Sequence, residues 1–282
     1  MNQRYTAESV TEGHPDKLCD IIADSVLDEC LAHDALSRVA CEALATRGNI
    51  VVAGEITSSY DPPIPGIIHS VLQKVGYDPA RYAIHSFVHK QSPDIAAGME
   101  YSLECRRNFS EDQPALQLGA GDQGVMVGYA CSETPQVMPL PVVLAHRLTN
   151  ALTIARKSGT IQGLRPDGKA QVTVEYGEDG KPLRLDAVVL SAQHSPEKPM
   201  DELCWALTDA VLIPALQALP PDENTKILLN PSGRFVLGGP EADTGLTGRK
   251  LMVDSYGVFA PHGGAFSGKD PTKVDRSGAY MA

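Results

Sequence analysis

The sequence predicts an α+β fold in which helices alternate with two-stranded hairpins. Helical stretches with apolar residues at three- and four-residue steps are followed by runs with strand-like alternation, whereas the long apolar runs typical of parallel sheets do not occur. The order of helix and hairpin recurs along the chain, which suggests internal duplication, although residue identity between the units is low. A length of 282 residues is enough for two or three domains.

The N-terminal part is expected to contain two helices, a hairpin and a further strand. The first helix begins beside Pro15, where a missing N–H costs nothing, and the second is closed by Gly76, a suitable left-handed cap. Periodicity and turn residues predict helix 16–33, hairpin strands 39–46 and 50–59, helix 67–75 and strand 82–89.

Further along the chain, a second hairpin is expected to turn at Asp179-Gly180, and a long helix is expected to be kinked or split at Pro214. Segment 98–118 has no periodicity, which is typical of a lid or a linker. From residue 226, short apolar runs separated by glycine predict short strands. The remaining expected elements are helix 141–157, hairpin strands 170–176 and 182–192, and helix 200–218.

Four aspartates follow one another at four-residue steps along the first predicted helix: Asp16, Asp20, Asp24 and Asp28. Like charges at this spacing destabilise a helix by a few tenths of a kcal/mol per pair. For Asp24 and Asp28 we therefore expect a solvated face. Asp16 differs, because it lies beside His14 at the helix N-terminus, where the backbone dipole favours an anion.

The net charge of −11 argues against a protein that binds nucleic acid or an anionic membrane. The charge is uneven, because residues 224–282 carry seven basic and five acidic side chains. That end of the chain could hold a small polyanion such as a phosphorylated metabolite.

The sequence has neither an apolar run long enough to cross a membrane nor a basic-then-apolar leader, so a cytoplasmic location is expected. The six cysteines form no CxxC pair and are expected to be buried thiols.

Residues 263–269 match the GxxxxGK pattern of a phosphate-binding loop. Asp270 stands where that loop needs a Ser or Thr to hold magnesium, and Pro271 follows at once, so a true P-loop is disfavoured. A weaker interpretation remains, in which flexible backbone and Lys269 approach a phosphate. The surrounding stretch is either a solvated loop or a site for a nucleotide polyphosphate with Mg²⁺, since it mixes cations with carboxylates. Its charged residues are Arg249, Lys250, Lys269, Asp270, Lys273, Asp275 and Arg276.

Seven motifs follow one another along the whole chain: ESVTEGHPDK (8–17), KQSPDI (90–95), GAGDQG (119–124), RPDGKAQVTV (165–174), NPSGRFVLGGP (230–240), DTGLTGRK (243–250) and HGGAFSGKDPTKVDRS (262–277). In this order they resemble the motif series of the S-adenosylmethionine synthetase (methionine adenosyltransferase) family. The chain departs from that series in having two glycines after His262, where the family has three.

The resemblance implies three similar, pseudo-symmetric domains of sheet plus helices, with the third incomplete in this chain. The expected division is an N-terminal domain at 1–97, a mobile gating loop at 98–118, a central domain at 119–223 and the start of a C-terminal domain at 224–282. It also implies a dimer with shared active sites, expected to assemble further into a tetramer.

The activity implied by the resemblance joins L-methionine to ATP, with Mg²⁺ (two per site) and K⁺ as cofactors. The methionine sulfur attacks C5′ of the ribose, and the displaced triphosphate is cleaved to pyrophosphate and phosphate. Because a thioether needs no general base, alignment and charge neutralisation lower the barrier. Two alternatives stay open: a non-catalytic paralogue or fragment that pairs with a complete subunit, and a P-loop-like phosphotransferase.

The resemblance assigns roles residue by residue. His14 lies beside the bridging oxygen, Phe235 stacks on adenine and Asp243 touches both substrates. The residues expected to act on the reacting triphosphate are His14, Lys169, Arg249 and Lys269. The ATP-site matches are His14, Asp167, Lys169, Arg234, Phe235, Asp243, Arg249, Lys250, Ala265 and Lys269. The methionine-site matches are Glu55, Gln91, Asp122, Asp243 and Lys273. The metal-ligand matches are Asp16 and Asp275 for Mg²⁺ and Glu42 for K⁺.

Overall fold

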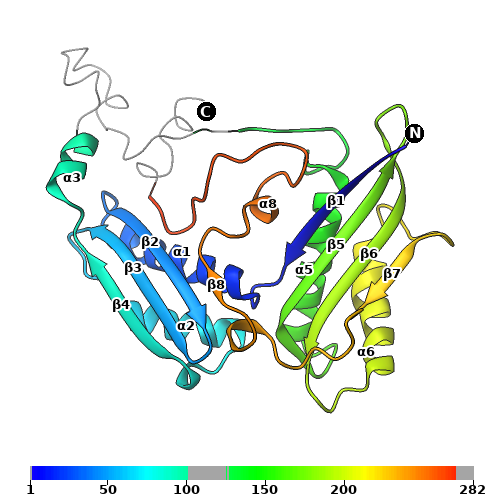
Figure 1. The fold of residues 1–282 in the computed structure, drawn as a ribbon, viewed down its shortest axis with the longest axis horizontal. Coiled ribbons are helices and arrows are strands. Elements are labelled where there is room, and N and C mark those ends of the chain that lie inside the picture. The colour runs from blue at the N-terminus through cyan, green and yellow to red at the C-terminus, as the bar shows by residue number, and fades with distance from the viewer. Residues whose placement is uncertain (1, 101–124, 126, 271–282) are drawn as a thin grey trace.

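A computed structural model describes residues 2–100, 125 and 127–270 of the chain. It has two lobes, each with a four-stranded sheet covered by helices, and the segment that follows β7, orange to red in Figure 1, runs between them. This mixture of sheets and helices confirms the predicted α+β class. The predicted gating loop lies outside the described residues from 101 onward. In the described parts of the chain, no helix combines the length and apolar character needed to cross a bilayer.

The first lobe contains the predicted hairpin and helices. Its hairpin strands pair antiparallel, so that Glu42 lies opposite Ala53, while the outer strand pairs parallel with the second hairpin strand. Across the sheet the strands are β4 (Ala83–His89), β3 (Asn49–Thr57), β2 (Arg38–Thr46) and β8 (Gly245–Leu246). Helices α1 (Pro15–His33) and α2 (Ile64–Val75) cover one face of this sheet, and the short elements η1 (Pro79–Arg81) and α3 (Pro93–Glu100) flank β4.

The second lobe contains one strand that the sequence did not predict. β1 (Gln3–Val10) pairs antiparallel with β5 (Leu164–Tyr176), although the two are far apart in the chain. The sheet continues through β6 (Pro182–His194) to β7 (Lys226–Leu229), which is parallel to β6. The covering helices are α5 (Leu140–Lys157), α6 (Met200–Leu207) and α7 (Ile213–Ala215), the last two joined by the π-helical turn η3 (Thr208–Leu212). The helix predicted over 200–218, with a kink or split at Pro214, is thus interrupted by η3 just before Pro214 and ends at Ala215.

The prediction of successive short strands after residue 226 is largely wrong. Within the described residues of this stretch only β7 and the two-residue β8 are strands. Residues 251–254 form the short helix α8 (Leu251–Asp254), and η4 (Gly239–Glu241) is a 3-10 turn. The stretch is held by isolated contacts to α1, β2 and β6 rather than by its own sheet.

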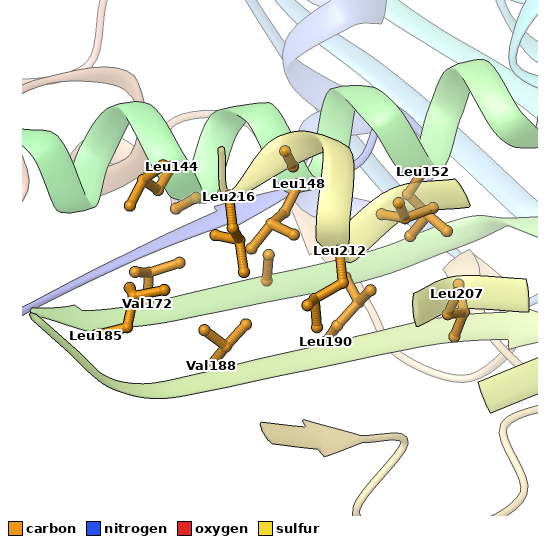
Figure 2. Close-up of a cluster of buried hydrophobic side chains, with 14 of the residues drawn as sticks. Leu144, Leu148, Leu152, Val172, Leu185, Val188, Leu190, Leu207, Leu212 and Leu216 are labelled. Carbon is orange, nitrogen blue, oxygen red and sulfur yellow. The ribbon is translucent and has the colours of Figure 1, made fainter. Parts of the chain in front are cut away.

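The core of the second lobe lies between α5 and the inward faces of β5 and β6, where leucines and valines interdigitate (Figure 2). Leu144, Leu148 and Leu152 recur at four-residue steps on α5, so they share one helix face. They meet Val172 and Leu190, whose side chains point to the buried face while their strand neighbours point to the other face. Burial of this face explains why α5 was predictable from its sequence.

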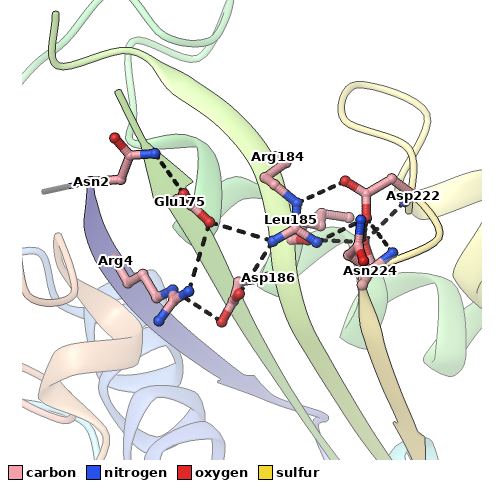
Figure 3. Close-up of polar contacts among 9 residues, drawn as sticks. Asn2, Arg4, Glu175, Arg184, Leu185, Asp186, Asp222 and Asn224 are labelled. Carbon is pink, nitrogen blue, oxygen red and sulfur yellow. Dashed lines mark hydrogen bonds and ion pairs between the residues drawn. The ribbon is translucent and has the colours of Figure 1, made fainter. Parts of the chain in front are cut away.

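The opposite face of the same sheet is polar. Arg184 donates to both oxygens of Asp222, at 2.7 and 2.8 Å, and lies 3.4 Å from Glu175 (Figure 3). Arg4 of β1 forms ion pairs with Glu175 and with Asp186 of β6. The Arg184 guanidinium holds the pKa of Asp222 well below its usual range. These contacts tie β1, β5, β6 and the loop before β7 together from the solvent side.

Shortening a buried core side chain should destabilise the fold. Leu148 is fully buried at 0% exposure, so Leu148→Ala should lower the free energy of unfolding by about 2–5 kcal/mol. Ile154, on the same helix, is 59% exposed, and Ile154→Ala should change the free energy of unfolding by less than about 0.5 kcal/mol. Urea denaturation of both variants tests this difference; equal effects would contradict the described packing of α5.

Candidate active site

His14 caps the N-terminus of α1 with a ring nitrogen. Its Nδ1 accepts the backbone N–H of Asp16 at 3.2 Å. Because Nδ1 is an acceptor, the proton of the neutral ring sits on Nε2. Burial, and next the neighbouring Lys250, lower the pKa of His14 to about 4. At neutral pH His14 is therefore an uncharged ring with one N–H donor that its cap contact does not use.

Asp16 lies next to His14 and is 2% exposed. Its Oδ2 accepts from Lys250 Nζ at 2.6 Å, its Oδ1 accepts the backbone N–H of Leu246 at 3.0 Å, and Arg249 Nε is 3.5 Å away. Burial alone would raise the pKa of Asp16, but these hydrogen bonds and cations outweigh it, and the pKa is lowered. The carboxylate is thus ionised and flanked by two cations.

Lys169 approaches the same place from the second lobe. It lies opposite Val10 in the β1–β5 pairing, and its Nζ is 2.6 Å from Glu8 Oε2. Lys169, Lys250, Asp16 and Asp243 all act electrostatically on His14. The structure therefore brings predicted residues from both lobes together around the start of α1.

Asp167 is 8% exposed, and its Oδ2 accepts the backbone N–H of Gly239 at 2.7 Å. Burial raises the pKa of Asp167 to about 6, and the charge of Asp243 adds to this effect. Beside it, the hydroxyl of Tyr77 donates to the carbonyl of Gly13 at 2.6 Å. Asp167 thus fixes the loop that leads to Asp243.

A second group of predicted residues lies on the outer face of the first-lobe sheet. Lys269 Nζ is 2.7 Å from Glu42 Oε1, and His89 Nε2 is 3.5 Å from Glu55 Oε1. The strand register puts both carboxylates on one face, diagonally across β2 and β3. Gln91 follows β4, and its buried Oε1 has no hydrogen-bond partner among the described residues. Across the described residues, no hydrogen bond or ion pair joins the Lys269–Glu42 pair to the group around His14.

The remaining predicted residues lie in loops. Phe235 and its neighbour Arg234 border the end of β6, where Phe235 N–H donates to His194 Nε2 at 3.1 Å. Ala265 lies against Gly248, because a Cβ on that glycine would come within 2.6 Å of the Ala265 Cβ. Asp122, Lys273 and Asp275 lie outside the described residues.

Sequence reasoning missed some contacts in this region. Glu8 lies inside the first motif but received no role, although it pairs with Lys169. The histidines His89 and His194 were given no role; His89 is largely exposed and lies 3.5 Å from Glu55, and the buried His194 accepts the backbone N–H of Phe235. The expectation that Asp24 is solvated is wrong, because its Oδ1 accepts the backbone N–H of Gly268 at 2.7 Å. Asp28 is exposed as expected.

The P-loop interpretation fails on its structural context. A P-loop follows a buried strand, but the described residues before Gly263 form turns and irregular backbone after α8. The prediction of buried thiols is confirmed for Cys19, Cys30 and Cys41, whereas Cys131 and Cys204 are free thiols that are only partly buried. Cys105 lies outside the described residues.

A divalent cation can be tested against the donors around His14. No group of three His, Cys, Asp or Glu side chains gathers in the described part of the chain, so these residues form no all-protein metal cage. Mg²⁺ bound with a polyphosphate needs only one or two carboxylates. The ionised Asp16 carboxylate fits that smaller requirement.

Comparison with known protein families gives three matches in chain order. The N-terminal, central and C-terminal domain models of S-adenosylmethionine synthetase match residues 2–93, 117–235 and 237–282. The chain belongs to the S-adenosylmethionine synthetase family. The resemblance seen in the motifs is therefore confirmed, and the group around His14 is that of a synthetase-family member.

The neutrality of His14 in this synthetase-family chain predicts a pH effect on stability. Its folded pKa of about 4 lies below the ordinary 6.5, so the unfolded chain binds more protons between these values. Lowering the pH from 7 to 5 should therefore cost the folded protein about 1–2 kcal/mol through His14. Asp167, whose pKa is raised, acts in the opposite direction.

The variant His14→Asn isolates this effect, because Asn can cap the helix and does not titrate. The difference in free energy of unfolding between the two proteins, measured by urea denaturation at pH 7 and pH 5, should shift in favour of the variant at pH 5. If the wild type and His14→Asn lose the same free energy of unfolding between pH 7 and pH 5, the lowered pKa of His14 is contradicted.

Proposed function

We propose that this chain is a methionine adenosyltransferase that forms S-adenosylmethionine from ATP and L-methionine. The methionine sulfur forms a bond to C5′ of ATP as the bond from C5′ to the triphosphate oxygen breaks, and the electron pair leaves with the triphosphate. The triphosphate is then hydrolysed to pyrophosphate and phosphate. The observation that carries the proposal is the gathering of Arg249 and Lys250 on Asp16, next to His14, in a chain that matches all three domain models of the family.

In this proposal, His14 donates its Nε2–H to the leaving oxygen. An uncharged donor suits this place, because charge develops on that oxygen only as the bond breaks. Lys169, Lys250, Arg249 and Lys269 neutralise the triphosphate. Each of these cations already faces a carboxylate in the structure, which keeps it oriented before the substrate arrives.

The adenosine part of ATP is assigned to the loops of the second lobe. Phe235 offers an aromatic face for adenine, and Arg234 is exposed beside it. Asp167 and Ala265 help shape the ATP pocket by fixing their loops, and Asp243 lies between the two substrates. Methionine is assigned to the outer sheet face, with Glu55 and Gln91 as its described contacts; Asp122 and Lys273 complete that site in the proposal.

The proposed cofactors are Mg²⁺ and K⁺. Asp16 would hold Mg²⁺ together with Asp275, and Glu42 would hold K⁺. When bound, Mg²⁺ would neutralise triphosphate charge that the lysines alone leave uncompensated. In the structure Lys250 is paired with the Asp16 carboxylate, and Lys269 is paired with the Glu42 carboxylate. These lysines must therefore turn towards phosphate oxygens when the metal cations bind.

The activity assay uses the purified full chain with ATP, L-methionine, MgCl₂ and KCl. We expect S-adenosylmethionine, pyrophosphate and phosphate in equal amounts, and no product after chelation of Mg²⁺.

Lys269→Ala should lower turnover by about 100-fold or more with little change in thermal stability, because its partner Glu42 is 47% exposed. Lys181→Ala removes a lysine that is paired with Asp179 in a remote surface turn, and it should leave turnover unchanged. A well-folded wild-type chain without product would refute the proposal.

The proposed partner is a second copy of the chain, docked on the outer face of the first-lobe sheet. Among the described residues, helices cover only the inner face of this sheet, and Phe87, 64% exposed, lies in one cross-strand row with Ala53 and Glu42. A sheet face with exposed apolar side chains is stabilised by a second layer. Docking here would put Glu42 and Glu55 at the interface, which fits an active site shared between subunits, and two such dimers would form the tetramer.

Introducing a charge on this face should prevent association. We expect the wild-type chain to sediment as a dimer or tetramer and Phe87→Arg to sediment as a monomer, since a buried unpaired cation is strongly disfavoured. Leu36 is 83% exposed in the turn after α1, and Leu36→Arg serves as the control that should leave the oligomer intact. A monomeric wild-type chain, or an unchanged Phe87→Arg variant, would contradict the proposed interface.

A further inference from the structure

The acidic face of α1 holds the backbone of residues far along the chain. Asp16 accepts the N–H of Leu246 at 3.0 Å, Asp20 that of Gly248 at 2.9 Å, and Asp24 that of Gly268 at 2.7 Å. The three aspartates are four residues apart, so they form one row on the helix. The row is thus a line of acceptors for the loops between the lobes.

Two of the donors are glycines in conformations that other residues rarely adopt. Gly248 has φ +77° and Gly268 has φ +72°. A Cβ on Gly268 would lie 2.3 Å from the carbonyl oxygen of Cys41 and 2.7 Å from the Cβ of Ala23. The loop can therefore approach α1 closely enough to donate to Asp24 only because this residue has no side chain.

Each of these glycines is followed directly by residues that the proposed function assigns to the triphosphate. Arg249 and Lys250 come after Gly248, and Lys269 comes after Gly268. Neighbouring Cα atoms are 3.8 Å apart, so fixing the glycine amide limits where the next side chain can begin. On its other side, Gly268 accepts the N–H of Cys41 at 2.8 Å, which leaves the peptide little freedom.

We propose that Asp20 and Asp24 are positioning residues, which hold the peptides before Arg249 and Lys269 and thereby set the cations for a polyphosphate chain. This inference rests on the proposed function for the role of those cations. Asp20 is 1% exposed, and its second oxygen lies 3.1 Å from Lys17 Nζ without hydrogen-bond geometry. Asp24 is the better residue to test, because within the described residues its carboxylate makes a single hydrogen bond, which comes from Gly268.

The test compares four variants at two positions on the same helix face. Asp24→Asn keeps an oxygen acceptor for Gly268 and removes the charge. Asp24→Glu keeps the charge and moves the oxygens outward by one methylene, while Asp24→Ala removes the acceptor. Asp28→Ala is the matched control, because Asp28 is exposed and makes no hydrogen bond or ion pair within the described residues.

The probes are inorganic tripolyphosphate with Mg²⁺, measured by titration calorimetry, and the kcat and KM of the adenosyltransferase assay. Misplacement by 1 Å can cost on the order of 100-fold, and the remaining anchor at Cys41 should limit the shift, so we expect about 10-fold weaker tripolyphosphate binding for Asp24→Ala and Asp24→Glu. Asp24→Asn and Asp28→Ala should stay close to wild type. The KM for methionine should change little, since Glu55 lies on β3 and Gln91 follows β4, away from the peptides that Asp24 holds.

The outcomes separate the inference from the function on which it rests. If Asp24→Asn binds as weakly as Asp24→Glu, or if Asp24→Ala matches Asp28→Ala, the positioning role is refuted. The Asn and Glu variants decide the question even where Asp24→Ala does not fold. A wild-type chain that binds tripolyphosphate in the expected variant order but makes no S-adenosylmethionine would refute the proposed function and leave the positioning role standing. No binding of tripolyphosphate by the wild type would refute the inference.

Discussion

Carboxylates buried on α1 must find donors, and the donors come from residues 245–270. Leaving a buried charge without partners would be strongly unfavourable, and Asp16 and Asp20 are almost completely buried. Their partners are backbone N–H groups and the side chains of Lys17, Arg249 and Lys250. This requirement folds a glycine-rich segment with little regular structure against the first lobe. Without it, Arg249 and Lys250 would have no fixed place next to His14.

The elements that could be predicted are those whose information is local. α1 and α5 have one buried face with a clear period, and β2 and β3 are joined by a short turn. β1 was missed because its partner is distant: Ala7 lies opposite Val172. The same reason explains Asp24, whose acceptor role depends on a glycine 244 residues away. Strands after residue 226 were over-predicted, because backbone groups of residues such as Phe235 and Val253 hydrogen-bond to His194 and His146 of the second lobe instead of pairing with one another.

The candidate site shows a different limit of prediction from the sequence. Motif order was enough to recognise the family, and it nominated the residues of the candidate site, because those residue types are tied to the chemistry. The protonation state of His14 and the ion pairs of the site could not be predicted from the motifs. The neutral ring of His14 follows from burial and from the contact of Nδ1 with the backbone, and the pairing of Glu8 with Lys169 follows from the register of β1 on β5. Both depend on the assembled lobes.

The ion pairs of the site have a consequence for selectivity. Lys169, Lys250 and Lys269 each have a carboxylate within 2.7 Å, so an incoming anion must compete with an internal one. A single phosphate that displaces one carboxylate gains little, because it leaves that carboxylate unpaired. A polyphosphate that arrives with its own metal ions can exchange several pairs at once: its oxygens take the lysines, and its cations take the carboxylates. Under the proposed function, the site would therefore favour metal-loaded polyphosphates over free anions, and its binding would depend less on salt than the number of its cations suggests.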